Sequence, residues 1–180
     1  EITTHTMFRN TIKNTIKSGE KILLNEEQRY VAESIIKDME NGDMMPSLIK
    51  GVTGSGKTEV YLELIEWVIN RGGDVICLIP EISLTYQTVM RFYNRFGDIV
   101  SVINSKMSKG ERYDSFEMAK SGKIRIMIGP RSALFTPFNR LSLIIIDEEH
   151  ESAYKSENVP RYHARETAIE LAKMTGAKVV

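Results

Sequence analysis

From residue 46 onward, short apolar runs alternate with longer amphipathic stretches, and this alternation limits the folds that the chain can adopt. A short apolar run is typical of a buried strand, and an amphipathic stretch is typical of a helix with one apolar face. When the two alternate, the strands run parallel because each helix carries the chain back across the sheet. We therefore predict an α/β fold with a mostly parallel central sheet and helices on both of its faces.

The same pattern predicts where the elements begin and end. We expect strands over residues 47–49, 75–79, 99–103, 124–128, 143–146 and 178–180, and helices over 57–70, 84–96, 108–120 and 163–173. A further helix should begin after Asn25, which can cap it, and end at Asn41 and Gly42. Residues 1–22 have no sustained period and are expected to be a linker or the tail of a preceding domain, which leaves 23–180 as the folded unit.

Composition excludes several classes of protein. The 180 residues contain 24 Lys and Arg against 24 Asp and Glu, so the chain is neither a polybasic tail nor an acidic disordered segment. Cys77 is the single cysteine, and the spacings of a zinc site are missing, which predicts no zinc in this chain. No apolar run approaches the roughly 20 residues of a membrane span, so we expect a cytoplasmic location and no membrane partner. Because the chain starts at Glu1 and stops within an apolar run, we also expect a fragment of a longer protein.

A glycine-rich segment lies between the first predicted strand and the helix over 57–70. Glycine stands at its first and sixth positions and is followed by lysine and threonine, the pattern of loops that wrap nucleotide phosphates. Backbone N–H groups and the helix N-terminus would converge on an anion there. Lys57 would neutralise the β- and γ-phosphates of ATP, and Thr58 would complete the shell of a Mg²⁺ ion. The predicted nucleotide ligands are Gly51, Thr53, Gly54, Ser55, Gly56, Lys57 and Thr58. The alternative is an ordinary Gly/Ser-rich turn with an incidental lysine.

Carboxylates follow the apolar run at 143–146. In open parallel sheets, ligands bind at the C-terminal ends of the strands, which is where Asp147 and Glu148 should lie. Asp147 is suited to hold Mg²⁺ through its water shell, and Glu148 to orient and deprotonate an attacking water. Taken alone, acidic residues after a strand can equally cap a helix.

The segment Asp147-Glu148-Glu149-His150 resembles the second motif of superfamily 2 helicases, Asp-Glu-x-His/Asp. Within that class, residues 51–61, 80–82, 110–114, 131–135 and 160–165 together resemble the bacterial replication-restart helicases. The resemblance extends over roughly residues 24–180 and implies their first RecA-like motor domain, a P-loop NTPase domain in which ATP hydrolysis drives 3′-to-5′ movement along DNA at stalled forks. It implies single-stranded and forked DNA, a second RecA-like domain of the same parent chain, primosome proteins and single-strand binding protein as partners.

The resemblance also assigns roles to individual residues. Gln28 takes the position where these helicases read adenine, and His150 the position that couples nucleotide state to DNA contact. An exposed helical glutamine and a structural histidine are the alternatives. The family's loops that grip the DNA backbone correspond to residues 80–85 and 129–132, which makes Thr85, Arg131 and Ser132 the expected DNA contacts. Glu149 receives no distinct role.

The chain departs from the family pattern in several places. Pro130 replaces the usual threonine, and Asn104-Ser105 replaces a His-Ser pair, which leaves the DNA contacts at both loops open. The family's cysteine-rich zinc module, its amino-terminal DNA-binding region and its second motor domain with an arginine finger are not in this chain. We therefore expect the chain alone to be nearly inactive as an ATPase.

Charge is unevenly distributed along the chain. Residues 91–131 contain nine Lys and Arg against four Asp and Glu, and acidic residues concentrate at 147–157. This layout predicts a positive side suited to a phosphate backbone, with a solvated face of mixed charge as the alternative.

Two other functions share the phosphate loop. Another superfamily 2 DNA translocase or repair helicase would carry the acidic motif too, but is not expected to carry the segments at 110–114 and 160–165 together. A nucleotide-dependent switch module would bind nucleotide without motor activity. DNA-stimulated ATP hydrolysis by the complete parent protein separates the switch from both helicases.

Overall fold

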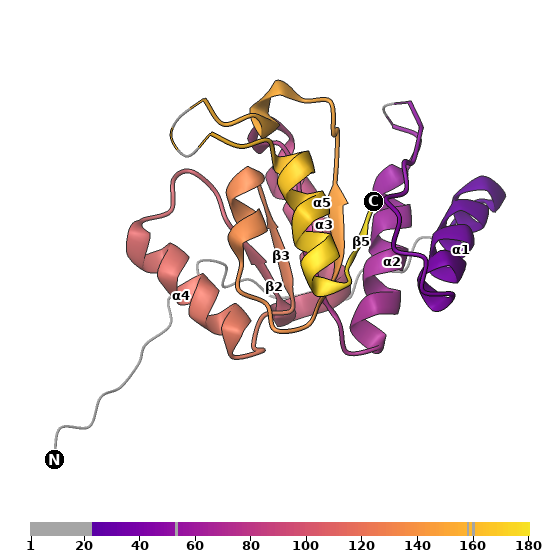
Figure 1. Cartoon of the computed structure of the whole chain (residues 1–180), viewed down its shortest axis with the longest axis horizontal. Helices are drawn as coiled ribbons and strands as arrows, with labels where there is room; N and C mark the ends of the chain where they lie inside the picture. The colour runs from indigo at the N-terminus through magenta and orange to yellow at the C-terminus, as the bar shows by residue number, and fades with distance from the viewer. Residues whose placement is uncertain (1–22, 53, 158, 160) are drawn as a thin grey trace, which may run out of the picture.

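The structure, a computed structural model, describes residues 23–52, 54–157, 159 and 161–180. Three sequence-based expectations lie outside these ranges: the linker at residues 1–22, the phosphate-loop ligand Thr53, and Pro160 at the start of the 160–165 segment. Figure 1 shows the described part as a central sheet flanked by helices.

Five strands form the sheet in the order β2-β3-β1-β4-β5, and all neighbours are parallel. The strands are β1 (Asp74–Leu78), β2 (Val100–Val102), β3 (Ile126–Gly129), β4 (Leu141–Ile146) and β5 (Lys178–Val179). The predicted α/β fold with a parallel sheet is therefore confirmed. At its centre, β1 and β4 pair in register from Val75 with Leu143 to Leu78 with Ile146. Their C-terminal ends consequently lie side by side.

The prediction of a strand over residues 47–49 is wrong. A single backbone hydrogen bond joins this segment to the sheet edge, from Ser47 N to Val179 O at 2.9 Å. Leu48 is 77% exposed, so the apolar run is not buried as a sheet strand would be. One such bond does not make the series of ladder bonds that defines a strand.

The helices lie close to their predicted positions. They are α1 (Glu26–Glu40), α2 (Lys57–Asn70), α3 (Tyr86–Phe96), α4 (Lys109–Lys120) and α5 (Ala164–Thr175). Asn25 and Ser108 cap α1 and α4 with complete capping boxes. Helix α3 begins two residues later than predicted because Thr85 is extended and accepts the Thr88 N–H as its N-cap. Within the described ranges, no helix combines the length and apolar character of a membrane span.

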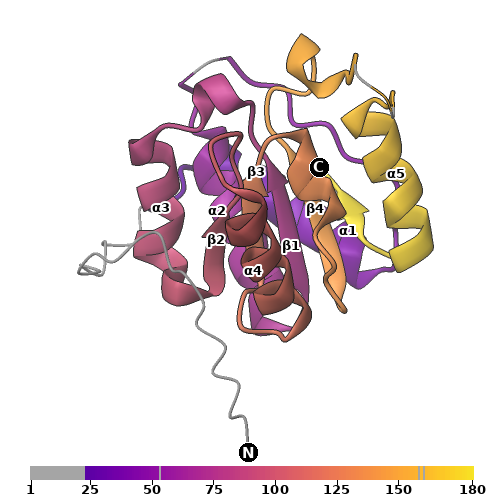
Figure 2. The ribbon, with the colours of Figure 1, turned by 90° about the vertical axis from the view of Figure 1, so that its left-hand side faces the viewer.

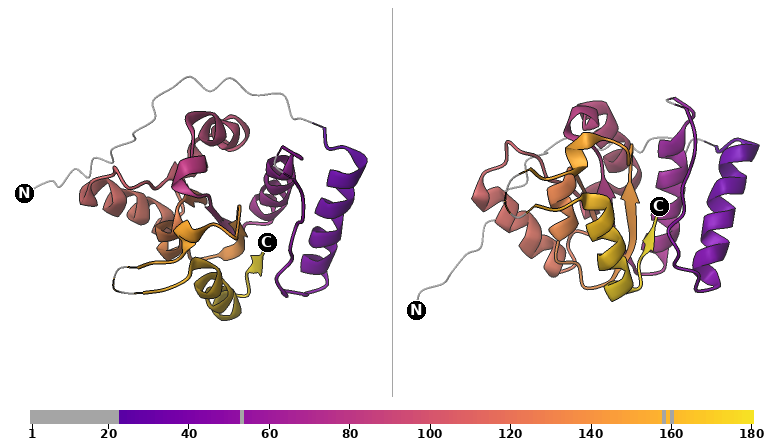
Figure 3. Two further views of the ribbon diagram at one scale, coloured as in Figure 1. Left: turned by 90° about the horizontal axis from the view of Figure 1, so that it is seen from above. Right: turned by 45° about the horizontal axis from the view of Figure 1, so that its top comes forward.

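Alternate residues of the strands face two separate cores. Val75 and Cys77 of β1 face the core beneath α1, α2 and α3, whereas Ile76 and Leu78 face the core beneath α4, α5 and the short 3₁₀ helix η3 (Arg131–Phe135). Figure 2 shows α4 and α2 on opposite sides of the strands. Helix α1 packs on α2 and lies on the far side of it from the sheet, as both views in Figure 3 show. Helices thus cover both faces, as predicted.

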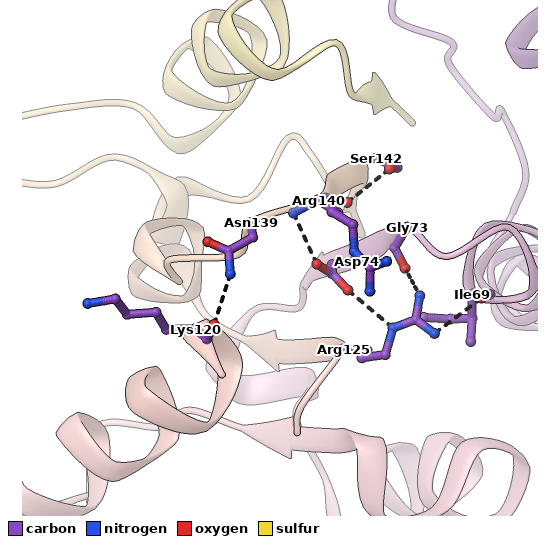
Figure 4. A network of polar contacts seen from close by, with 8 residues as sticks. All are labelled: Ile69, Gly73, Asp74, Lys120, Arg125, Asn139, Arg140 and Ser142. Carbon is purple, nitrogen blue, oxygen red and sulfur yellow. Dashed lines mark hydrogen bonds and ion pairs between the residues drawn. The ribbon is translucent and has the colours of Figure 1, made fainter. Parts of the chain in front are cut away.

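A polar network fastens the N-terminal ends of β1, β3 and β4 (Figure 4). Asp74 is 4% exposed and accepts from Arg125 Nε at 3.2 Å and from Arg140 N at 3.1 Å. Arg125 also donates to the Ile69 carbonyl at 3.2 Å, which ties in the end of α2. Removing Arg125 would leave the buried Asp74 carboxylate without its charged partner. The network fixes the end of the sheet opposite to the phosphate loop.

The central strand gives a test through its cysteine. Cys77 has no exposed surface, and burial raises the pKa of its thiol, so reactive thiolate is scarce at neutral pH. We expect dithionitrobenzoate to label Cys77 in the native chain only as fast as the chain unfolds, and to label it immediately in denaturant. Immediate release of one equivalent of thionitrobenzoate under native conditions would contradict a buried β1.

Candidate nucleotide-binding site

The predicted phosphate loop and acidic motif meet at one end of the sheet. The loop leads into the N-terminus of α2, and the turn after β4 carries the carboxylates. Figure 1 shows both at the upper end of the molecule. The parallel pairing of β1 and β4 aligns this edge.

Glycines at two positions set the path of the loop. Gly54 and Gly56 have φ angles of 81° and 82°, in the left-handed region that residues with a Cβ rarely adopt. Gly56 is the N-cap of α2, so this turn directs the loop into the helix. A Cβ atom at Gly56 would lie 2.2 Å from Nε2 of Gln28, whereas at Gly54 it would meet nothing within 4 Å. Backbone conformation therefore favours glycine at both positions, and a Cβ at Gly56 would also displace the flexible end of the Gln28 side chain.

The Lys57 ammonium points back into the loop. Its Nζ donates to the Gly51 carbonyl at 2.9 Å and lies 3.7 Å from Oε1 of Glu148. The Lys57 side chain is 16% exposed. The structure thus brings the predicted phosphate-binding cation and the predicted base together.

Tyrosines from both faces of the sheet hold Asp147. The Tyr61 hydroxyl, from α2, donates to Oδ1 of Asp147 at 3.1 Å. The Tyr154 hydroxyl lies 2.6 Å from the Asp147 carbonyl and 3.1 Å from the Leu78 carbonyl, so its proton is within reach of both. Burial raises the pKa of the Asp147 carboxyl, the Tyr61 hydrogen bond lowers it, and the charge of Glu148 raises it. Burial also raises the pKa of both phenols, which therefore keep the protons that they donate.

Glu148 stands in a left-handed turn. Its φ is 50°, the single positive φ outside glycine in the described part of the chain. The Glu151 N–H closes the turn by donating to the Glu148 carbonyl at 2.9 Å. Such a conformation costs a residue with a Cβ roughly 1–2 kcal/mol. The turn places the Glu148 carboxylate beside Lys57.

The next two residues of the motif face different partners. Oε2 of Glu149 accepts from Arg165 of α5 at 2.8 Å, which ties the motif to that helix. His150 is 70% exposed in its side chain, and its Nε2 lies 3.6 Å from Oε2 of Glu148. The coupling role of His150 stays a prediction. Glu149, to which the sequence assigned no role, forms an ion pair that links the acidic motif to α5.

The oxygens of Thr58 and Asp147 suit a hard cation. Thr58 lies in the first turn of α2, and Asp147 directly follows β4. Mg²⁺ takes oxygen ligands and is usually held by one or two carboxylates together with phosphates and waters. Among the residues that the structure describes, no group of three or more His, Cys, Asp and Glu side chains could hold a metal. A Mg²⁺ ion at these two residues would therefore take its remaining ligands from nucleotide phosphates and waters.

Gln28 braces the phosphate loop from α1. Its Nε2 donates to the Ser55 carbonyl at 3.1 Å, and its Oε1 accepts from Asn25 N at 3.0 Å. Each end of the amide retains one more hydrogen-bonding site. Adenine recognition by Gln28 thus stays a prediction, and its contact with the loop is an additional finding.

An open pocket of about 610 Å³ adjoins these groups. Polar and charged side chains line one part of it: Lys57, Tyr61, Glu148, Glu149, His150 and Arg165. Residues of the 46–51 segment and the apolar side chains of Ile146, Ile169, Val179 and Val180 line the rest. The charged groups of the site are therefore accessible from outside.

The expected DNA contacts lie in loops that follow β1 and β3. Thr85 is exposed and caps α3. Arg131 uses Nη1 to donate to the carbonyls of Ala153 at 2.7 Å and Lys155 at 3.0 Å, and Ser132 is half-buried. The structure thus engages Arg131 in holding the segment after the acidic motif. DNA binding by these three residues stays a prediction.

The two departures from the family pattern also have local roles. Pro130 precedes η3 as its N-cap. Oδ1 of Asn104 accepts from Lys106 N at 3.0 Å, and Ser105 donates from its hydroxyl and its backbone to Glu81. The two hydrogen bonds from Ser105 lower the pKa of the Glu81 carboxyl. Asn104 therefore shapes its own turn.

Ion pairs with acidic residues from elsewhere in the chain partly neutralise the predicted surplus of positive charge at 91–131. Three of its nine basic residues pair with acids from outside that window. The pairs are Arg91–Glu59 at 2.9 Å, Arg95–Glu63 at 2.8 Å, Arg95–Glu66 at 2.7 Å and Arg125–Asp74 at 3.2 Å. A count over a sequence window misses these partners because they come from α2 and β1.

Sequence reasoning missed Tyr61 and Tyr154. A signal for Tyr61 was present, because it follows Lys57 by four residues and therefore lies on the same side of α2, one turn further on. Tyr154 had no such signal. Its contact depends on the 3₁₀ helix η4 (Ser152–Tyr154) folding back over the ends of β1 and β4.

The sequence matches the family described as "Type III restriction enzyme, res subunit" over residues 21–175. Among curated proteins, Replication restart protein PriA of Bacillus subtilis (strain 168) is 48% identical over 91% of this chain and 20% of its own length. The proteins of the same name from Chlamydia pneumoniae and Haemophilus influenzae are 44% and 49% identical, over 87% and 74% of this chain and 21% and 18% of theirs. The chain thus spans about a fifth of the length of these relatives.

A solved structure is similar in fold. It is the "ATP-dependent Type ISP restriction-modification enzyme LlaBIII bound to DNA", with a TM-score of 0.58 and 16% sequence identity over 88% of this chain and 12% of that one. The likeness confirms the expected RecA-like α/β fold. By sequence, the chain belongs to the Type III restriction enzyme res subunit family, and its expected resemblance to the bacterial replication restart proteins PriA is confirmed.

Proposed function

We propose that residues 23–180 are the first RecA-like motor domain, and hence the ATP-binding half, of an ATP-dependent 3′-to-5′ DNA helicase that acts in restart of stalled replication forks. One observation carries the proposal: Lys57 Nζ lies 3.7 Å from the Glu148 carboxylate, next to Asp147. A phosphate-binding cation, a carboxylate for a metal shell and a candidate base for water thus converge at the start of α2. The names of the PriA relatives supply the replication-restart role.

Each group has a chemical task in this proposal. The loop N–H groups and the N-terminus of α2 bind the phosphates, and Lys57 neutralises the β- and γ-phosphates. Thr58 and, through the ion's water shell, Asp147 would hold Mg²⁺, which would supply positive charge to the phosphate oxygens. Glu148 orients the attacking water and accepts its proton. Gln28 recognises adenine with the hydrogen-bonding sites that its loop contact leaves unused.

The partners follow from the same proposal. A second RecA-like domain of the parent protein covers the nucleotide from the other side and supplies an arginine finger. Single-stranded and forked DNA bind along the loops of Thr85 and of Arg131 and Ser132, and His150 couples DNA contact to nucleotide state. Primosome proteins and single-strand binding protein are partners of the full-length parent.

Removal of the Lys57 ammonium tests the phosphate site. We expect Lys57→Ala to abolish measurable binding of a non-hydrolysable ATP analogue by calorimetry, because the loop loses its side-chain cation at the β- and γ-phosphates. Lys37→Ala, which removes an exposed lysine from the last turn of α1, is the matched control and should bind as the unaltered chain does. Unchanged affinity in Lys57→Ala would refute the phosphate-loop assignment.

The two left-handed glycines give a second test of the loop. Gly54→Ala and Gly56→Ala both introduce a Cβ at positive φ, which costs about 1 kcal/mol. Gly56→Ala adds the 2.2 Å contact with Gln28 and should lower both the free energy of unfolding and the nucleotide affinity further than Gly54→Ala. Urea unfolding and calorimetry measure the two effects. Equal losses in both variants would show that Gln28 moves aside without cost.

The half-motor proposal predicts how catalysis depends on the parent protein. An arginine finger contributes on the order of 10³ to 10⁵ in turnover rate, so the isolated chain should release phosphate barely above background, with or without single-stranded DNA. The full-length parent should show DNA-stimulated phosphate release. Its Glu148→Gln variant should bind nucleotide but not turn it over.

The outcomes of this assay separate the candidate functions. A parent protein that binds nucleotide without DNA-stimulated hydrolysis would be a nucleotide switch rather than a motor. Stimulated hydrolysis would fit both helicase candidates, which the segments at 110–114 and 160–165 distinguish. Robust DNA-stimulated hydrolysis by the isolated chain would contradict the half-motor proposal.

A further inference from the structure

Helix α2 presents two polar side chains, one turn apart, to the turn after β4. Lys57 and Tyr61 are separated by four residues and therefore lie on one face of the helix. Lys57 Nζ is 3.7 Å from Oε1 of Glu148, and the Tyr61 hydroxyl is 3.1 Å from Oδ1 of Asp147. The helix that starts at the phosphate loop thus contacts two successive carboxylates with two successive turns.

The Asp147 carboxyl is confined by these contacts. Tyr61 is 6% exposed and belongs to the core beneath α2, while Tyr154 is 1% exposed and belongs to the opposite core. One hydroxyl holds the side chain of Asp147 and the other holds its backbone carbonyl. A residue fixed at both points by buried phenols has little freedom to reorient.

We propose that Tyr61 is a positioning residue for the Mg²⁺–nucleotide complex, which it serves by holding the Asp147 carboxylate in the orientation that receives the metal's water shell. The inference rests on the proposed function, because it takes Asp147 as the carboxylate of the metal shell. Partners that orient a metal-binding carboxylate by a hydrogen bond commonly change metal affinity by about 10- to 100-fold when they are removed.

The geometry gives the Tyr61 hydroxyl this task rather than a packing role. The ring alone fills the space in the core beneath α2, and phenylalanine would fill it equally. The oxygen adds one directed contact, and its acceptor is the carboxylate of Asp147, which directly follows β4. Each carboxylate oxygen has two lone pairs, so Oδ1 can accept from Tyr61 and from a metal-bound water together.

Tyr61→Phe in this chain is the test, because it removes the hydroxyl and keeps the ring. Mn²⁺ serves as the probe in place of Mg²⁺, and electron paramagnetic resonance measures its affinity for the complex of the chain with ADP. We expect Tyr61→Phe to weaken Mn²⁺ binding in the ADP complex by roughly tenfold. Calorimetry with excess EDTA should give an unchanged affinity for metal-free ADP.

Two further variants make the result specific. Tyr93→Phe removes the hydroxyl of another buried tyrosine, on α3, and should change neither affinity. Asp147→Asn should weaken Mn²⁺ binding at least as much as Tyr61→Phe does. Circular dichroism melting identifies any variant that has lost its fold. If Tyr61→Phe is unfolded, Asp147→Asn still reports whether the carboxylate governs metal affinity.

Three results would count against the inference, and they can be told apart. Equal Mn²⁺ affinity in Tyr61→Phe and the unaltered chain overturns the positioning role and leaves the proposed function intact. Equal losses with and without metal would mean that Tyr61 shapes the phosphate loop instead. Failure of the unaltered chain to bind ADP at all would overturn the proposed function and this inference with it.

Discussion

The parallel pairing of β1 with β4 is the constraint on which the rest of the structure depends. In-register pairing from Val75–Leu143 to Leu78–Ile146 places the loop after β1 and the turn after β4 at one edge. Two further bonds continue the alignment into the site: Asp147 N donates to Leu78 O at 2.9 Å, and the Tyr154 hydroxyl lies 3.1 Å from that same carbonyl. The phosphate loop can face the acidic motif because α2 packs on the sheet that this pairing creates.

Sequence patterns predicted element positions correctly where residues close in sequence determine the structure. The helix after the phosphate loop has its predicted bounds, Lys57–Asn70, because glycine pairs flank an amphipathic stretch on both sides. The strand at 47–49 failed because a strand requires a ladder of hydrogen bonds to a neighbour, and this segment makes one, from Ser47 N to Val179 O. Motif positions predicted that Lys57 and Glu148 belong to one site, but they did not predict the contact between them. The Tyr61–Asp147 contact depends on the packing of α2 against β4 and was not predicted either.

Charge was the least predictable property because ion pairs form across elements. Arg95 is 12% exposed and bridges Glu63 and Glu66 of α2, so it offsets the repulsion between two acids on one helix. Arg91 is 47% exposed, and its contact with the buried Glu59 lacks hydrogen-bond geometry at Oε1, which marks a weak pair. Together these contacts fix α3 against α2. The two arginines of α3 therefore pair with acidic residues of α2 within the chain itself.

The turn at Glu148 shows a local rule being broken with an identifiable compensation. A φ of 50° costs about 1–2 kcal/mol in a residue with a Cβ, and glycine would remove that cost. The surrounding bonds hold the turn: Asp147 N to Leu78 O and Glu151 N to Glu148 O, both at 2.9 Å, and Tyr154 on the Asp147 carbonyl. What glycine lacks is the carboxylate, which here reaches within 3.7 Å of Lys57. A strained backbone that its neighbours hold in place, so that it presents one charged group, is typical of functional sites. The backbone conformation of Glu148 therefore supports its role as the base in the proposed function.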